Sequence, residues 1–263
     1  LVYKIFRKRN IFMQRGIYKV CRRFPNQMRS FLLSGVKKAL GDQYDMSHFT
    51  PDYMPWDQRL CAIPDNDLFD VIRDGKASVV TDQIERFTEN GILLKSGKTL
   101  EADIIVTATG LELQLFGGIQ LSVDQEQIKP NEKMSYKGTL IEDVPNFAYL
   151  FGYTNTPWTL KIDLSCGYIC RLINELDIRQ MAAVKPVAPA NENTGNSIVH
   201  GMQSGYVQRG DWVLPRQGKS SEWFVSHNLE KDTEMYNLPI ESQNLVWVAA
   251  AQQSKAKAKS KVA

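Results

Sequence analysis

Two short stretches of the sequence carry residue types that could face a ligand. The first is Ala108-Thr109-Gly110, which follows the apolar run Ile104–Val106. Small residues and a glycine at the carboxyl end of a buried strand let a ligand approach the backbone, and α/β sheets bind cofactors at that edge. Tight packing of a strand end explains the same residues without a ligand, so both interpretations stay open.

The second stretch is Gly152–Thr159, which links an apolar segment to a predicted helix. Asn146–Phe151 has the pattern of a strand, Thr156 is a good N-cap, and Pro157 suits the first helical position. We expect the helix to end near Asp177. A strand, a short loop and a helix N-terminus present unpaired N–H groups and the positive end of the helix dipole to a ligand. A purely structural helix layer would have the same pattern.

Cysteine and histidine are too scattered to predict a metal site. Cys166 and Cys170 are one helical turn apart and could share a face, but no histidine cluster accompanies them. The four cysteine spacings also do not suit a disulfide framework, and we expect buried thiols in a reducing cytoplasm. The residues concerned are Cys21, Cys61, Cys166, Cys170, His48, His200 and His227.

Positive charge is concentrated at the start of the chain. The first 40 residues contain eleven Lys or Arg and no acidic residue. Apolar residues recur there at roughly helical spacing, which predicts amphipathic helices with a basic outer face, ending near Gly41. Such a segment could meet nucleic acid, an anionic membrane surface or a phosphate-bearing cofactor, and a solvated helix face explains it equally well. We predict no nucleic-acid partner, and a cytoplasmic protein that is either free or peripheral at the inner membrane face.

The bulk composition is that of a globular protein. The chain has 263 residues, 43% of them hydrophobic and 23% charged, which suits one large domain or two ordinary ones. The longest apolar runs, such as Leu245–Ala251, are far shorter than the ~20 residues that cross a bilayer. The start at Leu1, without a secretory signal, suggests a fragment or an expression boundary.

The middle of the chain predicts short strands. Ala77–Thr81 is β-branched, and Ile84–Phe87 and Gly91–Leu94 flank Asn90-Gly91, a hairpin signal because both turn positions need positive φ. Ile104–Val106 is continuously apolar, as expected of a parallel-sheet strand covered on both faces. Ala183–Gly195 has the composition of an exposed loop.

Several motifs in one order resemble the C-terminal portion of the class B flavoprotein monooxygenases of the Baeyer–Villiger type. The most specific is Pro55-Trp56-Asp57-Gln58-Arg59-Leu60, at a fixed distance before Asp103 and Ala108-Thr109-Gly110-Leu111. Gly152-Tyr153-Thr154-Asn155-Thr156-Pro157-Trp158-Thr159-Leu160-Lys161 follows. The resemblance covers about residues 20–230, to Leu214-Pro215-Arg216-Gln217-Gly218.

The resemblance implies an α/β fold: an incomplete two-dinucleotide-binding (FAD/NADP, Rossmann-like) flavoprotein fold with a β-meander and a helical insertion. Residues 1–53 would be the end of that basic insertion, 54–112 the C-terminal part of the NADP-binding domain, and 113–263 the C-terminal part of the FAD-binding domain. No G-x-G-x-x-G motif occurs in the chain. Both fingerprints would precede Leu1, so we expect the chain alone to bind neither FAD nor NADPH tightly and to be inactive.

The resemblance also assigns site residues. Arg59 would lie beside the flavin, where a permanently charged guanidinium can stabilise the anionic C4a-peroxyflavin and the adduct it forms with a ketone. A surface ion pair with Asp57 or Asp65 is the competing interpretation. The implied cofactor-binding residues are Gln58, Thr109 and Gly110, and Asn155, Thr156, Trp158 and Thr159 at the helix end facing the flavin pyrimidine. Trp158 could instead be a core residue, and Lys161 and Asp163 a solvated helix face.

The implied activity is insertion of one oxygen atom from O2 into a ketone or soft heteroatom, using FAD and NADPH. The substrate would be a small apolar carbonyl compound or thioether. An N- or S-oxygenating flavin monooxygenase is the alternative within the same fold. A non-catalytic remnant that binds a partner or a membrane surface is the alternative from another class.

Overall fold

The structure, a computed structural model, describes residues 2–58, 60–61, 63–202 and 204–250. The chain divides into two compact units. Unit 1 is Leu1–Glu112 with Met202–Tyr206, and unit 2 is Leu113–Gly201 with Val207–Ala263. The assignment of residues 1–53, 54–112 and 113–263 to parts of dinucleotide-binding domains stays a prediction.

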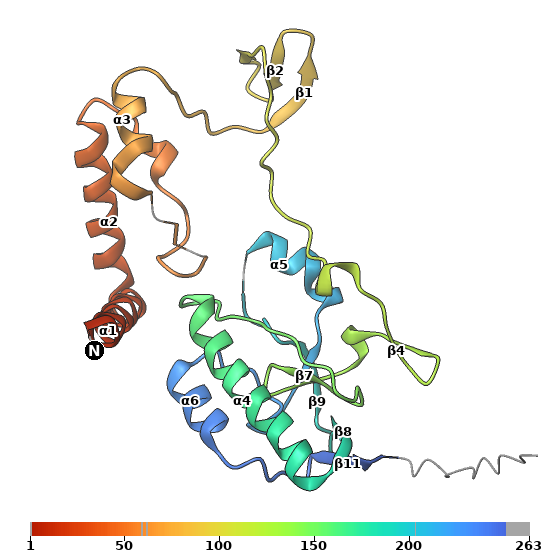
Figure 1. Ribbon diagram of the computed structural model, residues 1–263. Helices are drawn as coiled ribbons and strands as arrows, with labels where there is room; N and C mark the ends of the chain where they lie inside the picture. Colours follow the sequence, from red (N-terminus) through yellow and green to blue (C-terminus); the bar gives the residue numbers. More distant parts are fainter. Residues whose placement is uncertain (1, 59, 62, 203, 251–263) are drawn as a thin grey trace, which may run out of the picture. The chain divides into compact units, whose positions relative to one another are not determined.

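Unit 1 begins with the two predicted basic helices, α1 (Val2–Arg23) and α2 (Pro25–Leu40), coloured red to orange in Figure 1. Pro25 suits the first position of α2 because its missing N–H would have no helical partner. At the other end Gly41 has φ +93° and donates its N–H to Lys37 O, which closes α2. Short helical turns follow: η1 (Met46–Phe49), η2 (Pro64–Asn66) and α3 (Asp67–Arg73), and α3 packs against α2.

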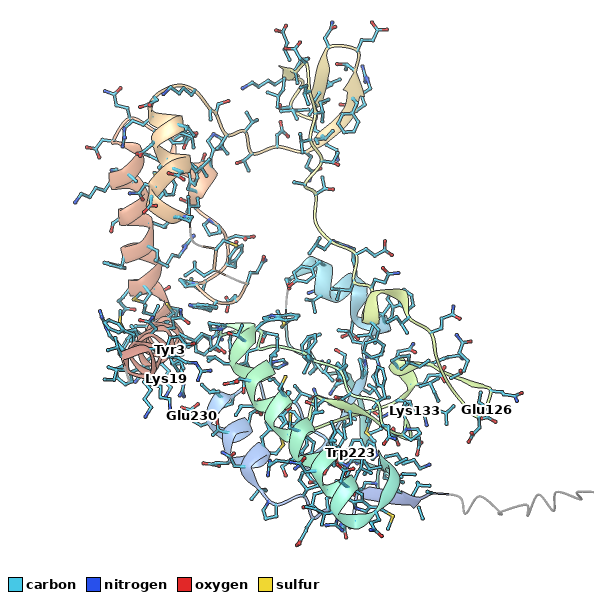
Figure 2. The ribbon with its side chains drawn as sticks, in the orientation of Figure 1. Tyr3, Lys19, Glu126, Lys133, Trp223 and Glu230 are labelled. Carbon is cyan, nitrogen blue, oxygen red and sulfur yellow. The ribbon has the colours of Figure 1, made fainter. Side chains whose placement is uncertain are left out.

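The apolar residues of α1 are exposed. Only Cys21 of this helix is buried, whereas Tyr3, Phe6, Phe12 and Ile17 are exposed; Figure 2 labels Tyr3 among them. The amphipathic helix was predicted correctly, but within the described residues its apolar face is uncovered. The expected burial of the thiols is wrong for three cysteines, since Cys61, Cys166 and Cys170 are exposed.

The predicted meander is confirmed as an antiparallel sheet of β1 (Ile84–Thr88), β2 (Gly91–Leu94) and β3 (Thr99–Glu101), in that order. The predicted turn geometry is wrong. The loop residues are Glu89 and Asn90, neither of which has positive φ. Gly91 already pairs with Thr88 and Glu101, at φ +149°, and a Cβ there would lie 2.0 Å from Leu100 O. The glycine is therefore required by the close approach of β3, not by the turn.

Two predicted strands of this region are absent. Residues 77–83 and 102–114 contain no strand, and Ile104 and Val106 are 82% and 83% exposed. A strand of a parallel sheet needs neighbours for its backbone hydrogen bonds and its apolar faces. The described part of this chain puts no strand beside Ile104–Val106, so the local pattern alone does not form one.

In its described residues, unit 2 contains three helices and four antiparallel strand pairs (Figure 1). The helices are α4 (Trp158–Arg179), α5 (Gly205–Gly210), which begins in the Met202–Tyr206 segment of unit 1, and α6 (Leu229–Asn237). The pairs are β4 (Leu121–Val123) with β5 (Glu126–Ile128), β6 (Ser135–Tyr136) with β7 (Leu140–Ile141), β8 (Met181–Pro186) with β11 (Leu245–Ala249), and β9 (Asn193–Ser197) with β10 (Arg216–Gly218). Single helical turns lie at η3 (Leu115–Gly118), η4 (Pro130–Glu132) and η5 (Asp211–Val213).

The core of unit 2 lies between α4, α6 and the short strands. Trp223 is fully buried and meets Tyr136 edge to face at 5.0 Å between ring centroids; Figure 2 labels it among the packed side chains around α4. Tyr168 and Leu172 of α4 and Tyr236 of α6 belong to the same cluster. This core positions α4 and the loop that precedes it.

Three details of unit 2 differ from expectation. Ala183–Gly195 is not one exposed loop, because β8 runs to Pro186 and pairs with β11, far along the chain. Asn146–Phe151 is not a strand and has only the isolated bridge Leu140↔Ala148. The N-cap of α4 is Pro157 instead of Thr156. Among the helices that the structure describes, none has the length and apolar character that a bilayer span requires.

Candidate functional site

The segment Met54–Gln58 is fastened to α1. Arg22 Nη1 donates to Asp57 Oδ1 at 2.7 Å, and Met54 N donates to Asp57 Oδ2 at 3.2 Å. The Arg22 hydrogen bond holds the pKa of Asp57 below its usual range. Pro55 and Gln58 form an isolated bridge across this turn. Asp57 is one of the two carboxylates with which Arg59 would form a surface ion pair in the competing interpretation. In the structure, Asp57 is paired with Arg22.

Trp56 has a backbone conformation that bulky residues rarely adopt, with φ +71°. Its ring meets Tyr18 of α1 edge to face at 5.4 Å, and its side chain lies beside the buried Cys21 thiol. Burial raises the pKa of that thiol, and the neighbouring Trp56 opposes the shift. Strained backbone of this kind persists where the surroundings hold it, and it concentrates at functional sites.

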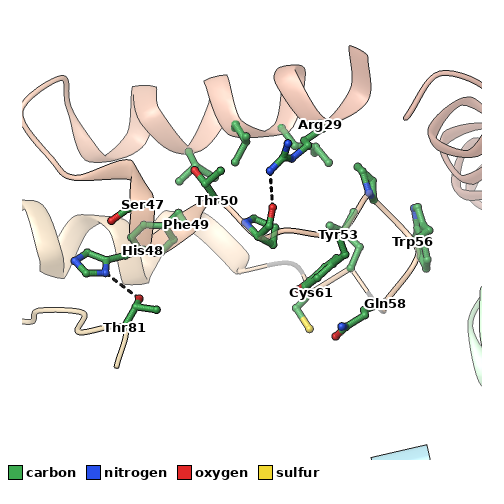
Figure 3. Close-up of a pocket in the computed structure, with 16 residues that line it drawn as sticks. Arg29, Ser47, His48, Phe49, Thr50, Tyr53, Trp56, Gln58, Cys61 and Thr81 are labelled. Atoms are coloured by element: carbon green, nitrogen blue, oxygen red, sulfur yellow. Dashed lines mark hydrogen bonds between the residues drawn. The ribbon is translucent and has the colours of Figure 1, made fainter. Parts of the chain in front are cut away.

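Arg59, the predicted catalytic residue, lies outside the described residues, and its role stays a prediction. Its neighbours Gln58 and Leu60 line a pocket of about 480 Å³ that lies entirely within unit 1 (Figure 3). The remaining lining comes from α2 and the following segment: Arg29, Leu32, Leu33, Val36, Ser47, His48, Phe49, Thr50, Pro51, Tyr53, Pro55, Trp56, Cys61 and Thr81.

Thr109 and Gly110 are exposed and lie in irregular backbone of unit 1. Gly110 has φ +116°, which favours glycine at this position. The other candidate residues, Asn155 to Thr159, belong to unit 2. The predicted cofactor-binding residues therefore form two groups, one in each unit.

The N-terminus of α4 carries no side-chain cap. Its N-cap is Pro157, which makes no capping hydrogen bond, and Trp158 and Thr159 in its first turn are exposed. Just before it, Asn155 Oδ1 and Thr156 Oγ1 are buried and have no hydrogen-bond partner. An uncapped helix end leaves N–H donors, and the two orphaned oxygens leave acceptors, so the loop holds unused hydrogen-bonding capacity of both kinds.

Glycine at position 152 is explained by Trp158. A Cβ on Gly152 would lie 2.2 Å from the Trp158 indole, which also packs against Phe151 at 5.3 Å between centroids. Trp158 is 44% exposed, so it is not a simple core residue. Asn155 Nδ2 donates to His227 O at 3.1 Å, which ties the loop to the chain before α6.

Lys161 of α4 is the residue that sequence reasoning misjudged. It is 1% exposed and its Nζ lies 3.4 Å from Asp232 Oδ2 of α6, so the prediction of a solvated position is wrong. Burial lowers the pKa of Lys161, and Asp232 opposes that shift. A signal was present: Lys161, Ser165, Tyr168 and Leu172 are spaced at helical intervals, and all four are buried. Asp163, by contrast, is exposed as predicted.

His227 lies beside this ion pair. Its Nε2 donates to Ile198 O at 2.8 Å, and its Nδ1 is buried without a partner. Burial is the main cause that lowers the pKa of His227. The imidazole is therefore neutral at pH 7 and lies beside the Lys161–Asp232 ion pair. Among the described residues, no group of three or more His, Cys, Asp or Glu side chains could hold a metal ion.

Comparison with curated proteins identifies close relatives. The chain is 49% identical over 230 residues to the FAD-binding monooxygenase AlmA of an Acinetobacter species. This alignment covers 88% of this chain and 46% of the relative. It is 48% identical over 252 residues to the FAD-containing monooxygenase MymA of Mycobacterium tuberculosis, covering 95% and 51%. Identity to the FAD-containing monooxygenase EthA of the same organism is 43% over 236 residues, covering 89% and 48%. No protein-family model matches the sequence.

Among solved structures, an oxidized steroid monooxygenase bound to NADP matches with a TM-score of 0.59 at 18% identity. The match covers 86% of this chain and 46% of that chain, and it shows the fold. This chain is therefore homologous to FAD-containing monooxygenases, has their Rossmann-like flavoprotein fold in incomplete form, and spans about half the length of the curated relatives it matches.

Proposed function

We propose that this chain is part of an FAD- and NADPH-dependent monooxygenase that inserts one atom of O2 into a ketone or a soft heteroatom. The observation that carries the proposal is the 48–49% identity to FAD-dependent monooxygenases along about nine-tenths of the chain. At that identity the loops that face a cofactor are expected to keep their chemistry. The predicted substrate is a small apolar carbonyl compound or thioether.

The residues at the start of α4 fit an edge of FAD. The flavin pyrimidine ring carries N–H and carbonyl groups, which need acceptors and donors respectively. Asn155 Oδ1 and Thr156 Oγ1 are orphaned acceptors, and the first turn of α4, with Trp158 and Thr159, has free donors and the positive end of the helix dipole. Bound FAD would supply the transfer of electrons from NADPH to O2. The helix end would favour the anionic form of the reduced ring.

Arg59 would contribute a permanent positive charge at the reacting oxygen. Its segment is held by the Asp57–Arg22 ion pair and by Trp56 against Tyr18. Gln58 on one side of it lines the pocket of unit 1. Thr109 and Gly110 would allow a cofactor to approach the backbone closely. A preorganised charge of this kind is worth about 3–4 kcal/mol in other enzymes.

The catalytic role of Arg59 is tested in the longer protein by Arg59→Ala. Flavin reduction by NADPH should stay measurable in a stopped-flow experiment, whereas oxygenated product falls by about 10²-fold or more, on the order of a lost oxyanion donor. Arg23→Ala, which removes an exposed charge at the end of α1, is the matched control and should leave turnover unchanged. Normal product formation by Arg59→Ala would remove this residue from the mechanism.

The 263-residue chain itself gives a simpler test of cofactor binding. We expect no flavin to be retained when FAD is added and the mixture is passed through a gel-filtration column, since no G-x-G-x-x-G is present to hold a pyrophosphate. Retention of one flavin per chain would show that the glycine fingerprint is not needed for binding. Parallel assays of the longer protein with an apolar ketone and a thioether would separate Baeyer–Villiger chemistry from N- or S-oxygenation.

A second activity is favoured by α1, namely weak contact with an anionic membrane surface. This helix exposes Tyr3, Phe6, Phe12 and Ile17, and it contains no acidic residue. Basic amphipathic helices with exposed aromatic residues can lie in the membrane interface, so α1 would hold the protein at the inner face of a membrane. Co-sedimentation with phosphatidylglycerol vesicles, lost in Phe6→Ser/Phe12→Ser and absent with phosphatidylcholine, would support it. Equal sedimentation of the variant would refute it.

A further inference from the structure

The pocket of unit 1 has the size and walls of a small-molecule site. Its volume is about 480 Å³, and ligand sites range over roughly 300–1,000 Å³. Leu33 and Val36 of α2 contribute apolar lining, and so do Phe49, Tyr53 and Trp56 of the following segment, which are labelled in Figure 3. None of the described lining residues is an Asp or Glu.

Arg29 brings a permanent positive charge to this apolar space. It reaches from α2 toward the loop below it, where its Nη2 donates to Pro51 O at 2.5 Å (Figure 3). Its Nε is buried without a partner. Within the described residues, no carboxylate lies within ion-pair distance of Arg29, so its charge is half-buried and uncompensated. Such a charge is costly unless an anion accompanies it.

The pocket has a basic side and an acidic side: α2 carries Arg29, whereas the segment that supplies most of the remaining lining contains Asp45, Asp52 and Asp57. The first 40 residues, which include all of α1 and α2, contain eleven basic residues and no acidic one. The charged residues of α2 itself are all basic, namely Arg29, Lys37 and Lys38. Asp57 is paired with Arg22, and none of the ion pairs among the described residues involves Arg29.

We propose that this pocket binds an amphiphilic carboxylate, with the apolar body between Leu33, Val36 and Phe49 and the carboxylate on the guanidinium of Arg29. A guanidinium binds a carboxylate through charge-assisted hydrogen bonds, which are about twice as strong as neutral ones. The proposal goes beyond the oxygenation reaction, because binding here needs neither FAD nor NADPH. Gln58 and Leu60 line the same pocket, so the ligand would lie beside the segment that carries Arg59.

Binding of decanoate to the 263-residue chain tests the proposal, measured by equilibrium dialysis below the micelle concentration. Decan-1-ol and decyltrimethylammonium have the same chain with a neutral and a cationic head. We expect one site per chain, decanoate at least tenfold tighter than decanol, and no binding of the cation. Arg29→Ala should weaken decanoate at least tenfold and change decanol less than twofold. Leu33→Trp, which fills the pocket, should abolish both.

Lys38→Ala is the matched control, since it removes one positive charge from the same helix at an exposed position outside the pocket lining. It should change decanoate binding less than twofold. Equal affinity for decanoate and decanol, an unchanged Arg29→Ala variant, or an equal loss in Lys38→Ala would overturn the proposal. If Arg29→Ala also abolishes decanol binding, the variant Arg29→Lys, which keeps the positive charge, is measured instead. A loss of decanoate affinity as large as in Arg29→Ala would then count against a carboxylate site. Binding unaffected by Leu33→Trp would place the ligand elsewhere, such as on α1, and would equally overturn the proposal.

Discussion

Units 1 and 2 differ in how their apolar residues are used. The buried apolar side chains described in unit 1 are Cys21, Leu40, Pro55, Ile72 and Leu94, whereas unit 2 has a continuous core around Tyr136, Trp223 and Tyr236. Unit 1 instead exposes large apolar residues along α1 and at Ile104–Val106. Local patterns are thus sufficient to form the helices and hairpins of unit 1, but only unit 2 buries its apolar side chains in one continuous core.

The polar contacts differ in the same way. Many hydrogen bonds of unit 2 join residues far apart in sequence: Tyr136 OH donates to Glu222 Oε1 at 2.7 Å, and Tyr236 OH donates to Lys137 O. Glu222 also accepts from Ser242 and Asn244, each at 2.8 Å. Unit 1 also has long-range bonds, such as Arg22 to Asp57 and Arg73 to Ala39 O, but these are exposed, as are bonds between near neighbours such as Lys76 to Asp74. Substitutions should therefore cost more in unit 2.

The largest effect is expected from Lys161→Met. Removing one partner of a buried ion pair leaves Asp232 charged and uncompensated, which costs about 3–5 kcal/mol of unfolding free energy. Urea unfolding measures this loss of unfolding free energy, and hydrogen exchange of the α4 amides shows whether the loss is local to this helix. The double variant Lys161→Met/Asp232→Leu should recover most of the loss, because an apolar pair replaces the charges. A loss below about 1 kcal/mol in the single variant would mean that the pair is solvated.

Within unit 1, the strongest effect should come from Gly91→Ala. The new Cβ meets Leu100 O, and the backbone is at φ +149°, so we expect a cost of about 1–3 kcal/mol to the β1–β2–β3 meander. Amide exchange of β2 and β3 reports it locally. Gly97→Ala is the matched control: position 97 also has positive φ (+86°), but a Cβ there would meet nothing within 4 Å. Equal losses would assign the effect to φ alone.

A pH dependence confined to unit 2 is expected from His227. Because burial lowers its pKa in the folded state, only the unfolded chain takes up this proton as the pH falls below about 6.5. Stability contributed by the neutral ring is present above that pH and is lost as the pH falls toward the folded pKa, by at most about 1.4 kcal/mol per pH unit. His227→Gln, whose amide can still donate to Ile198 O, should reduce that slope in melting temperatures measured from about pH 7 downward. An identical slope in the variant would show that His227 does not cause the pH dependence of the melting temperature.

The smallest effect is expected from Phe12→Ser on the exposed face of α1, within about 0.5 kcal/mol in thermal unfolding of this chain. The same change in the longer protein separates two possibilities. A loss of more than about 2 kcal/mol there would show that other parts of the protein cover the face, and this would weaken the membrane proposal. An unchanged melting temperature there leaves the face open to a lipid surface.

Residue patterns within single elements were enough to predict the helices and the meander. The basic helices ending near Gly41, the meander and the long helix after Pro157 follow from periodicity and from Pro and Gly at helix ends. Motif order was enough to indicate the homology that the comparisons confirm. The roles of Arg59, Gln58, Thr109, Gly110 and the Asn155–Thr159 loop stay predictions.

Which residues have partners depends on contacts between distant parts of the chain. Lys161 is buried because Asp232 on α6 pairs with it, and β8 exists because β11 lies beside it. Gly91 is needed because β3 approaches its backbone, and Ile104–Val106 is exposed because no strand of the described chain adjoins it. The pocket around Arg29 joins α2 to a segment some 20 to 30 residues further on. These features depend on long-range contacts, and periodicity within one element carries no information about them.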